Sequence, residues 1–212
     1  MIVAEGDARS YCARFVDQAA LDRLDAFRVA LVEENTRQNL IAKGSLESIW
    51  SRHIADSLQL LAYVPRETSL PLLDLGTGAG FPGLALAIAR PDIPVILVES
   101  RKKRIDWLKA NVDRFGLQNC SVKGARLENV ETVPVAVITA RAFAPLGKLL
   151  DLSARFSTPD TVWLLPKGRS AAQELKEQPN MLRNMFHVEQ SITDPEAKIL
   201  VGKGVPQTSS AR

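Results

Sequence analysis

The sequence predicts an α/β protein in which a mostly parallel sheet is closed by an antiparallel hairpin and preceded by a helical extension. From residue 66 onward, apolar runs typical of buried strands alternate with helical patterns, which favours a parallel sheet with right-handed crossovers. A glycine-rich turn at residues 76–83 joins the first of these strands to a helix. Further on, two apolar runs are separated only by the short segment Thr193–Glu196, which leaves no room for a crossover helix, so they are expected to pair as a hairpin.

Composition limits the class of protein. The 212 residues suffice for one sizeable α/β core, and the formal charge of +3 is weak evidence for a nucleic-acid partner. No apolar run approaches the length of a membrane span, and residues 1–7 lack the basic start and apolar core of a signal peptide, so we expect a cytoplasmic protein that binds no membrane. Cys12 and Cys120 lie far apart, with no CxxC motif and no metal-ligand spacing to a histidine. We therefore expect two free thiols and no metal.

Residues 1–65 are predicted to form a helical extension that packs on the core. Two stretches have apolar residues at three- and four-residue steps, as in amphipathic helices with one buried face. These residues are Tyr11, Phe15 and Val16, followed by Leu21, Leu24, Phe27, Leu31 and Val32. After a polar connection, Gly44 predicts a break and Ser45 an N-cap, although the capping box is imperfect. The next helix is predicted over residues 46–61, with Arg52 and Asp56 spaced for an i,i+4 ion pair on its polar face.

Residues 66–205 are predicted to be the core, and residues 206–212 a disordered tail. The predicted parallel strands are 70–75, 95–99, 120–123, 133–139 and 161–166. The predicted helices are 83–89, 102–115, 146–154 and 170–176, and the hairpin strands are 185–192 and 198–201. Trp50, Trp107 and Trp163 lie in apolar patterns and are expected in the core.

The strand, turn and helix around the glycine run are typical of a nucleotide-type cofactor site. Gly76, Gly78 and Gly80 let the backbone turn sharply and approach a ligand, because no Cβ stands in the way. Asp74 at the end of the first strand favours a cationic or hydroxyl-rich ligand over a phosphate. Glu99 ends the second strand, where it can accept hydrogen bonds from the ribose hydroxyls of an adenosine.

Two cofactors fit this pattern. Residues 78–83 match the dinucleotide motif GxGxxG, but Pro82 removes one N–H group that a pyrophosphate would use. The same turn also carries S-adenosylmethionine, whose ammonium group favours an acidic neighbour, and the closing hairpin departs from the all-parallel order of dinucleotide sheets. An NAD-dependent oxidoreductase would further need a catalytic residue such as tyrosine, and the chain has only Tyr11 and Tyr63, both in the helical extension.

Several segments between residues 39 and 168 carry a family resemblance in their order and residues. They are Asn39-Leu40, Arg52-His53-Ile54-Ala55-Asp56-Ser57, the run from Leu73 to Gly83, Glu99-Ser100 with Lys103-Arg104, the run from Thr139 to Ala144, and Lys167-Gly168. In this combination the chain resembles the bacterial small-subunit ribosomal RNA guanine-N7 methyltransferases, the glucose-inhibited division protein B family. The resemblance implies a Rossmann-like class I S-adenosylmethionine-dependent methyltransferase fold. It also implies methyl transfer to N7 of a guanine in 16S ribosomal RNA.

The resemblance assigns roles to particular residues. It implies that the cofactor is bound by Asp74, Gly76, Gly78, Gly80, Phe81, Glu99, Leu127, Glu128 and Arg141, with Leu127 and Glu128 framing the adenine. Arg141 and Lys167 would be the catalytic residues, and Arg141 would bind the guanine O6, a phosphate or the methionine carboxylate. Guanine N7 has an in-plane lone pair and no proton to lose, so the reaction needs no base, and catalysis is mainly alignment.

The predicted RNA-facing residues are Arg52, His53, Lys102, Lys103, Arg104 and Phe143. Positive charge at the start of a helix opposes the helix dipole, which favours a functional use for the basic run at residues 101–104. Phe143 is expected either to stack on an extruded guanine or to be a core side chain. We expect 16S ribosomal RNA or the small subunit as partner and a monomeric protein. A non-catalytic RNA-binding protein on the same scaffold stays open as an alternative.

Overall fold

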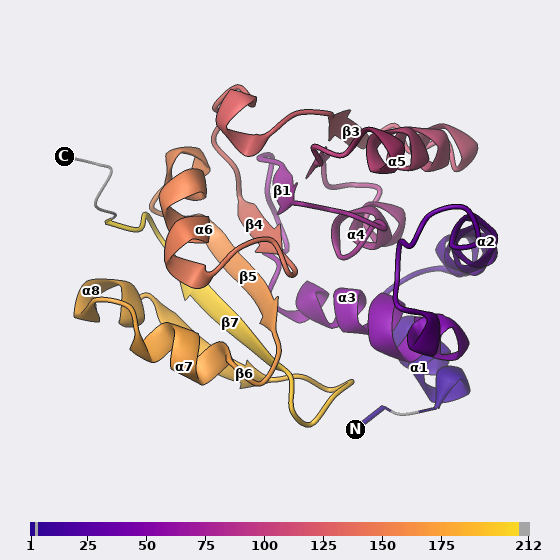
Figure 1. Cartoon of the computed structure of the whole chain (residues 1–212), viewed down its shortest axis with the longest axis horizontal. Coiled ribbons are helices and arrows are strands. Elements are labelled where there is room, and N and C mark those ends of the chain that lie inside the picture. Colours follow the sequence, from indigo (N-terminus) through magenta and orange to yellow (C-terminus); the bar gives the residue numbers. More distant parts are fainter. Residues whose placement is uncertain (3, 208–212) are drawn as a thin grey trace.

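The computed structural model describes residues 1–2 and 4–207 and contains a seven-stranded sheet with helices on both faces (Figure 1). The strands are β1 (Leu72–Leu75), β2 (Val95–Val98), β3 (Cys120–Lys123), β4 (Val137–Ala140), β5 (Val162–Lys167), β6 (Phe186–Gln190) and β7 (Lys198–Lys203). Their order is β3-β2-β1-β4-β5-β7-β6, in which β1 to β5 are parallel. The predicted α/β class with a parallel sheet is confirmed. Residues 206–212 are predicted to be disordered, and residues 208–212 of this tail lie outside the described residues.

The predicted closing hairpin is present, and β7 is its inner strand. β7 runs antiparallel to both β5 and β6, so the second strand of the hairpin separates the first from the parallel strands. Gly202 of β7 lies opposite Phe186 of β6, and a Cβ on this glycine would come within 2.5 Å of the phenylalanine ring. The hairpin therefore depends on a glycine at this position.

Two parallel strands are shorter than predicted at their starts. β1 begins at Leu72 because Pro71 has no N–H group to donate to a neighbouring strand. β4 begins at Val137, four residues later than predicted from the apolar run at residue 133. The amide of Val135 donates to the carbonyl of Phe156 at 3.0 Å, so this part of the run pairs outside the sheet.

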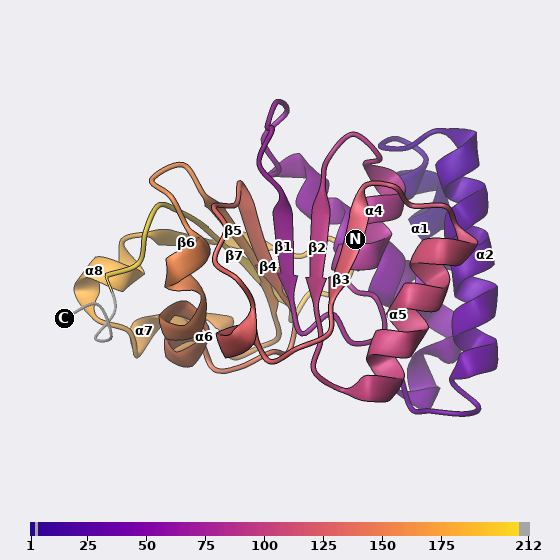
Figure 2. The ribbon, with the colours of Figure 1, turned by 90° about the horizontal axis from the view of Figure 1, so that it is seen from above.

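Helices cover the two faces of the sheet separately (Figure 2). One face carries α4 (Gly83–Ala89) and α5 (Lys102–Arg114), with residues 5–34 of the extension packed outside them. The other face carries α6 (Leu146–Ser153), α7 (Ala171–Lys176) and α8 (Asn180–Arg183). The four predicted core helices are confirmed to within one residue at each end, whereas the short α8 was not predicted.

The extension is helical, but it is less regular than its sequence predicts. It contains α1 (Glu5–Cys12), α2 (Gln18–Glu34), a 3₁₀ turn (Lys43–Ser48), a π-helical turn (Trp50–Ala55), α3 (Asp56–Leu58) and a 3₁₀ turn (Gln59–Ala62). The helix predicted over residues 46–61 is therefore present as a continuous run of helical turns, but it is not one regular α-helix. Ser45 is also no N-cap, because its hydroxyl donates to the carbonyl of Ala42. The carboxylate of Glu5 instead accepts the amides of Trp50 and Ser51, at 2.9 and 2.8 Å, and so caps this segment from α1.

The predicted buried faces of α1 and α2 also need correction. α1 ends at Cys12, so Phe15 and Val16 lie in the connection to α2 and are only partly buried. Val32 is 38% exposed, because it lies at the edge of the buried stripe of α2. The three tryptophans lie in the core as predicted. Both cysteines are free, and burial raises the pKa of each thiol to about 12. No helix in the described part of the chain is long and apolar enough to cross a membrane.

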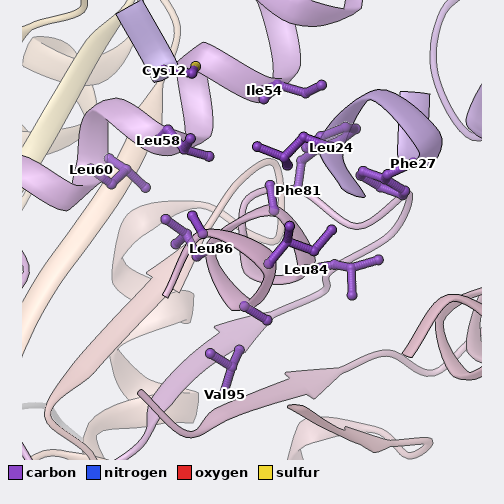
Figure 3. Close-up of a cluster of buried hydrophobic side chains, with 14 of the residues drawn as sticks. Cys12, Leu24, Phe27, Ile54, Leu58, Leu60, Phe81, Leu84, Leu86 and Val95 are labelled. Carbon is purple, nitrogen blue, oxygen red and sulfur yellow. The ribbon is translucent and has the colours of Figure 1, made fainter. Parts of the chain in front are cut away.

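Phe27 joins the extension to the core. Its side chain is fully buried, and its ring lies 5.3 Å from that of Phe81 and 6.1 Å from that of Trp107. In Figure 3, Leu24 and Phe27 of α2 lie close to Phe81 and Leu84 at the start of α4. The division of the chain into extension and core stays a prediction, but the two parts share this hydrophobic cluster.

Replacing Phe27 by alanine should lower the free energy of unfolding by about 3–5 kcal/mol, because it leaves a cavity between α2 and α4. Urea unfolding at fixed pH measures this change. Val29→Ala is the matched control on the same helix, since Val29 is 58% exposed, and its effect should stay within about 0.5 kcal/mol. Equal effects of the two substitutions would contradict the packing described here.

Candidate active site

The loop after β1 turns across the carboxyl ends of β1 and β2 before α4 begins. Gly76, Gly78 and Gly80 have φ angles of +67°, +61° and +117°, which residues with a Cβ rarely adopt. The amides of Gly76 and Thr77 donate to the carbonyl of Val98 at 2.8 and 3.1 Å, which fastens the loop to β2. The backbone of the loop therefore requires glycines at these positions, whatever ligand it contacts.

Asp74 is completely buried beneath this loop. Its carboxylate accepts the amide of Gly83 at 3.0 Å and the hydroxyl of Thr139 at 2.9 Å. A Cβ on Gly83 would lie 2.5 Å from the same carboxylate oxygen, so only glycine fits there. Burial raises the pKa of Asp74 to about 6, although the hydrogen bonds oppose this shift. Asp74 takes the first amide of α4, which a pyrophosphate would otherwise use, and its contacts are all within the protein.

Glu99 follows β2 and holds the same loop from the other side. One carboxylate oxygen accepts the amides of Ser100 and Arg101 at 2.7 and 2.9 Å, and the other accepts the amide of Gly78 at 3.1 Å. Arg104 lies 4.0 Å from the second oxygen. A carboxylate has about four acceptor positions, so three of those on Glu99 are already filled.

A cavity of about 350 Å³ opens beside Glu99, and we call it the first cavity. Four of the predicted cofactor residues line it, namely Gly76, Glu99, Leu127 and Glu128. Leu127 is buried, whereas Glu128 is exposed at the rim. Arg104 lines this cavity too, although it was predicted to face RNA. Asp74, Gly78, Gly80, Phe81 and Arg141 do not line it.

Gly80 and Phe81 lie in the hydrophobic core. A Cβ on Gly80 would come within 2.8 Å of the ring of Phe27. Phe81 is 3% exposed, and its ring stacks on that of His53 with the ring centres 5.1 Å apart. These two residues position the loop against the extension, and neither reaches the first cavity.

A second cavity, of about 1200 Å³, lies between the extension, the ends of β4 and β5, and the hairpin turn. The predicted functional residues that line it are Arg52, His53, Phe143, Arg141 and Lys167. The first and second cavities share only Ala142, Phe143 and Ala144, in the connection from β4 to α6. The ring of Phe143 covers Gly76 so closely that a Cβ on the glycine would lie 2.7 Å from Cδ2. Phe143 therefore separates the two cavities.

Arg141 is held by residues of the extension. Its Nη1 donates to Oδ2 of Asp56 at 3.2 Å, and its Nη2 donates to Nδ1 of His53 at 3.1 Å. The guanidinium also lies 5.4 Å from the centre of the Phe81 ring. The i,i+4 ion pair that the spacing of Arg52 and Asp56 allows is replaced by an ion pair with Arg141, which the end of β4 brings to this carboxylate.

His53 is neutral because of this arrangement. A guanidinium can only donate, so Nδ1 accepts from Arg141, and Nε2 donates to the hydroxyl of Ser45 at 3.0 Å. Burial, together with the nearby charges of Arg141 and Arg52, lowers the pKa of His53 to about 3. His53 therefore acts at neutral pH as an uncharged link between Ser45 and Arg141.

Among the other predicted cations, Lys167 is held by a partly buried contact. Its Nζ donates to Glu174 at 2.7 Å and to the carbonyl of Ala144 at 3.4 Å, next to Phe143. Lys102 pairs with Asp106 on the exposed side of α5, and Lys103 is exposed nearby; neither lines a cavity.

Sequence reasoning missed Asp56 and Thr193 as partners of this site. Asp56 lies in one of the family-like segments, so a signal for it existed. Thr193 contacts Asp56 across 137 positions of the chain, and no local pattern marks such a contact. Within the described ranges, no group of three or more His, Cys, Asp and Glu side chains is arranged to hold a metal ion.

The sheet order is that of the class I, Rossmann-like S-adenosylmethionine-dependent methyltransferase fold, and solved structures of this fold superpose on the chain. A methyltransferase of this type from Aquifex aeolicus superposes with a TM-score of 0.56 at 15% identity, over 74% of this chain and 93% of that one. A precorrin-6y C5,15-methyltransferase from Geobacter metallireducens superposes with a TM-score of 0.55 at 13% identity, over 79% of this chain and 92% of that one.

Sequence comparison identifies the family within this class. The GidB family, described as rRNA small subunit methyltransferase G, matches residues 20–199. A ribosomal RNA small subunit methyltransferase G from Erythrobacter litoralis is 57% identical over 98% of this chain and 100% of its own length. The protein of the same name from Novosphingobium aromaticivorans is 52% identical over 95% of this chain and 89% of its length. The chain belongs to the GidB family of ribosomal RNA small subunit methyltransferases. The dinucleotide oxidoreductase alternative is thereby excluded.

The buried carboxyl of Asp74 should make stability depend on pH. The pKa rises from an ordinary value of 3.8 to about 6 in the folded protein, so the native state binds this proton more tightly than the unfolded chain does. The free energy of unfolding should therefore fall by up to about 3 kcal/mol as the pH rises from about 4 to about 6, and should not change further above that. Asp74→Asn removes the titrating group and should abolish this fall. The variant should still fold, because its amide oxygen can accept the hydrogen bond from Gly83.

Urea unfolding of the two proteins across that pH range tests the prediction. Asp160→Asn is the matched control, because Asp160 is exposed. This substitution should leave the pH dependence of the parent protein unchanged. If Asp74→Asn keeps the same pH dependence as the parent, the assignment of this titration to Asp74 is wrong.

Proposed function

We propose that this protein transfers the methyl group of S-adenosylmethionine to N7 of a guanine in 16S ribosomal RNA of the small subunit. The observation that carries the proposal is the meeting of two cavities at residues 142–144. The first cavity offers an acid, Glu99, and an apolar wall, Leu127, which suit an adenosine ligand. The second offers cationic side chains, which suit RNA. Membership of the small-subunit ribosomal RNA methyltransferase family supports this assignment.

The residues of the first cavity fit the cofactor. Gly76 lines the cavity and its missing Cβ leaves room for the ring of Phe143, while Leu127 gives an apolar wall for an adenine. Glu99 has about one acceptor position left after its three backbone hydrogen bonds, which suits one ribose hydroxyl. We assign Arg104 to this cavity as well, and keep Glu128 at its rim. Asp74, Gly78, Gly80 and Phe81 support the loop and act on the cofactor only through it.

The chemistry requires alignment more than proton transfer. When bound, S-adenosylmethionine supplies an electrophilic methyl group on a sulfonium. The lone pair of guanine N7 lies in the base plane and carries no proton, so this chain needs to provide no general base. The residues around Phe143 then have one main task, which is to hold N7 in line with the methyl group at the partition between the cavities.

Arg141 and Lys167 lie on the acceptor side of that partition. Because Arg141 lines the second cavity and not the first, we assign it to the guanine O6 or a nearby phosphate, in preference to the methionine carboxylate. Lys167 contributes positive charge to the same cavity, with Glu174 holding its ammonium. Phe143 is placed to stack on the target base.

RNA outside the cavities would contact exposed cations. Arg52 is exposed at the rim of the second cavity, and Lys102 and Lys103 are exposed on α5. Phosphate contacts of this kind make binding strongly dependent on salt. The RNA substrate supports a cytoplasmic location. The monomeric state and the absence of a metal requirement stay predictions.

The test is methyl incorporation from labelled S-adenosylmethionine into small subunits and free 16S RNA from cells that lack this gene. Mapping of the modified base should place the methyl group on N7 of a guanine. Incorporation elsewhere would contradict the proposed atom. Binding of the RNA without incorporation would favour the alternative of a non-catalytic RNA-binding protein.

Gly76→Ala should weaken S-adenosylhomocysteine binding by about tenfold or more, because the new Cβ collides with Phe143 and the left-handed φ strains alanine. Isothermal titration calorimetry measures the dissociation constant. Gly44→Ala is the control, since no atom lies within 4 Å of its added Cβ. Unchanged affinity in Gly76→Ala would place the cofactor elsewhere.

Arg141→Ala should lower the single-turnover rate of methyl transfer by about a hundredfold, because the acceptor loses its anchor. The affinity for S-adenosylhomocysteine should change by less than about twofold, since Arg141 does not line the first cavity. Unfolding curves are measured alongside to confirm that the variant folds. An unchanged single-turnover rate would remove Arg141 from the mechanism.

A further inference from the structure

Asp56 makes three hydrogen bonds that use both of its carboxylate oxygens. Oδ2 accepts from Nη1 of Arg141 at 3.2 Å. Oδ1 accepts from the hydroxyl of Thr193 at 2.9 Å and from the amide group of Gln59 at 2.8 Å. The side chain of Asp56 is only 15% exposed, so its orientation is set by these three donors.

The three donors come from three separate parts of the fold. Arg141 follows β4, Thr193 belongs to the hairpin turn, and Gln59 belongs to the extension. Gln59 also accepts the amide of Ile192 at 2.9 Å, which ties the same turn to the extension a second time. Asp56 therefore lies where extension, sheet and hairpin meet, at the wall of the second cavity.

The guanidinium of Arg141 has no alternative carboxylate in this arrangement. Its contacts among the described residues are Asp56, the ring nitrogen of His53, the carbonyl of Arg52 at 3.4 Å and the face of Phe81. Only Asp56 carries a negative charge, because His53 is neutral. Removal of that charge would leave a guanidinium that is 24% exposed without an ionic partner.

We propose that Asp56 is a positioning residue for methyl transfer, which fixes the guanidinium of Arg141 on the second cavity and offsets its charge. This inference rests on the proposed function. Orientation matters because a planar guanidinium recognises an acceptor only when its N–H groups point at it.

Charge matters because transfer to N7 leaves positive charge on the imidazole ring of the guanine. An uncompensated cation beside that ring would oppose the developing charge. With Asp56 on one side, Arg141 can donate hydrogen bonds to the acceptor while the pair adds little net charge. The hairpin turn contributes through Thr193, whose hydroxyl donates a hydrogen bond to Oδ1 of Asp56.

Asp56→Asn tests the proposal, because it keeps the shape of the side chain and removes the charge. In the full chain, kcat for methyl transfer to small-subunit RNA should fall by about tenfold or more, with a smaller change in KM for the RNA. The dissociation constant for S-adenosylhomocysteine should stay within about twofold. Thr193→Val leaves the ion pair intact and should give a smaller loss of kcat. Asp92→Asn breaks a more exposed Arg–Asp pair, with Arg90, away from both cavities, and should leave kcat unchanged.

A double-mutant cycle separates positioning from a general structural role. If Asp56 acts through Arg141, Asp56→Asn should have little further effect in the Arg141→Ala background. Additive losses, or a kcat of Asp56→Asn equal to that of the parent protein, would overturn the inference while leaving the proposed function in place. If the parent protein itself transfers no methyl group to this RNA, the proposed function fails and this inference fails with it.

Discussion

The buried carboxylate of Asp74 is the interaction on which the rest of the active site depends. It joins three elements, because it belongs to β1 and accepts hydrogen bonds from Thr139 of β4 and Gly83 of α4. A buried acid without such partners is strongly destabilising, so both donors must be in place when the chain folds. The loop between β1 and α4 is therefore closed over the acid. Glu99 holds the same loop from the end of β2 by accepting the amide of Gly78, while the amides of Ser100 and Arg101 fix its carboxylate.

Once the loop is fixed, the positions of the two cavities follow. Gly76 lines the first cavity. The ring of Phe143 lies directly over Gly76 and separates the first cavity from the second cavity. Under the proposed function, the methyl donor and the base that receives the methyl group would have separate compartments that meet at Phe143. Such an arrangement suits a reaction whose main requirement is alignment. The fixed cationic groups then lie on the acceptor side, where Lys167 and Arg141 line the second cavity.

The extension completes the second cavity as well as covering the sheet. Its hydrophobic side packs Phe27 against the loop, and its polar side supplies Asp56 and His53 to Arg141. The irregular helical turns over residues 43–62 direct Asp56 and His53 toward Arg141. Their orientation is set by the capping of this segment by Glu5 and by the π-helical turn. Stability and the proposed function therefore depend on one interface in this protein.

The sequence by itself determined the fold class, the strand and helix order, the hairpin, the family and a cofactor loop. These depend on local periodicity, on glycine and proline, and on motifs read along the chain. Four of the predicted cofactor residues line the first cavity, but Asp74 and Phe81 turned inward to support it. Only the tertiary structure decided that Asp56 pairs with Arg141 and not with Arg52, and that β7 lies between β5 and β6. Such contacts join residues far apart in the chain, and they are set by packing and burial, which leave no periodic trace in the sequence.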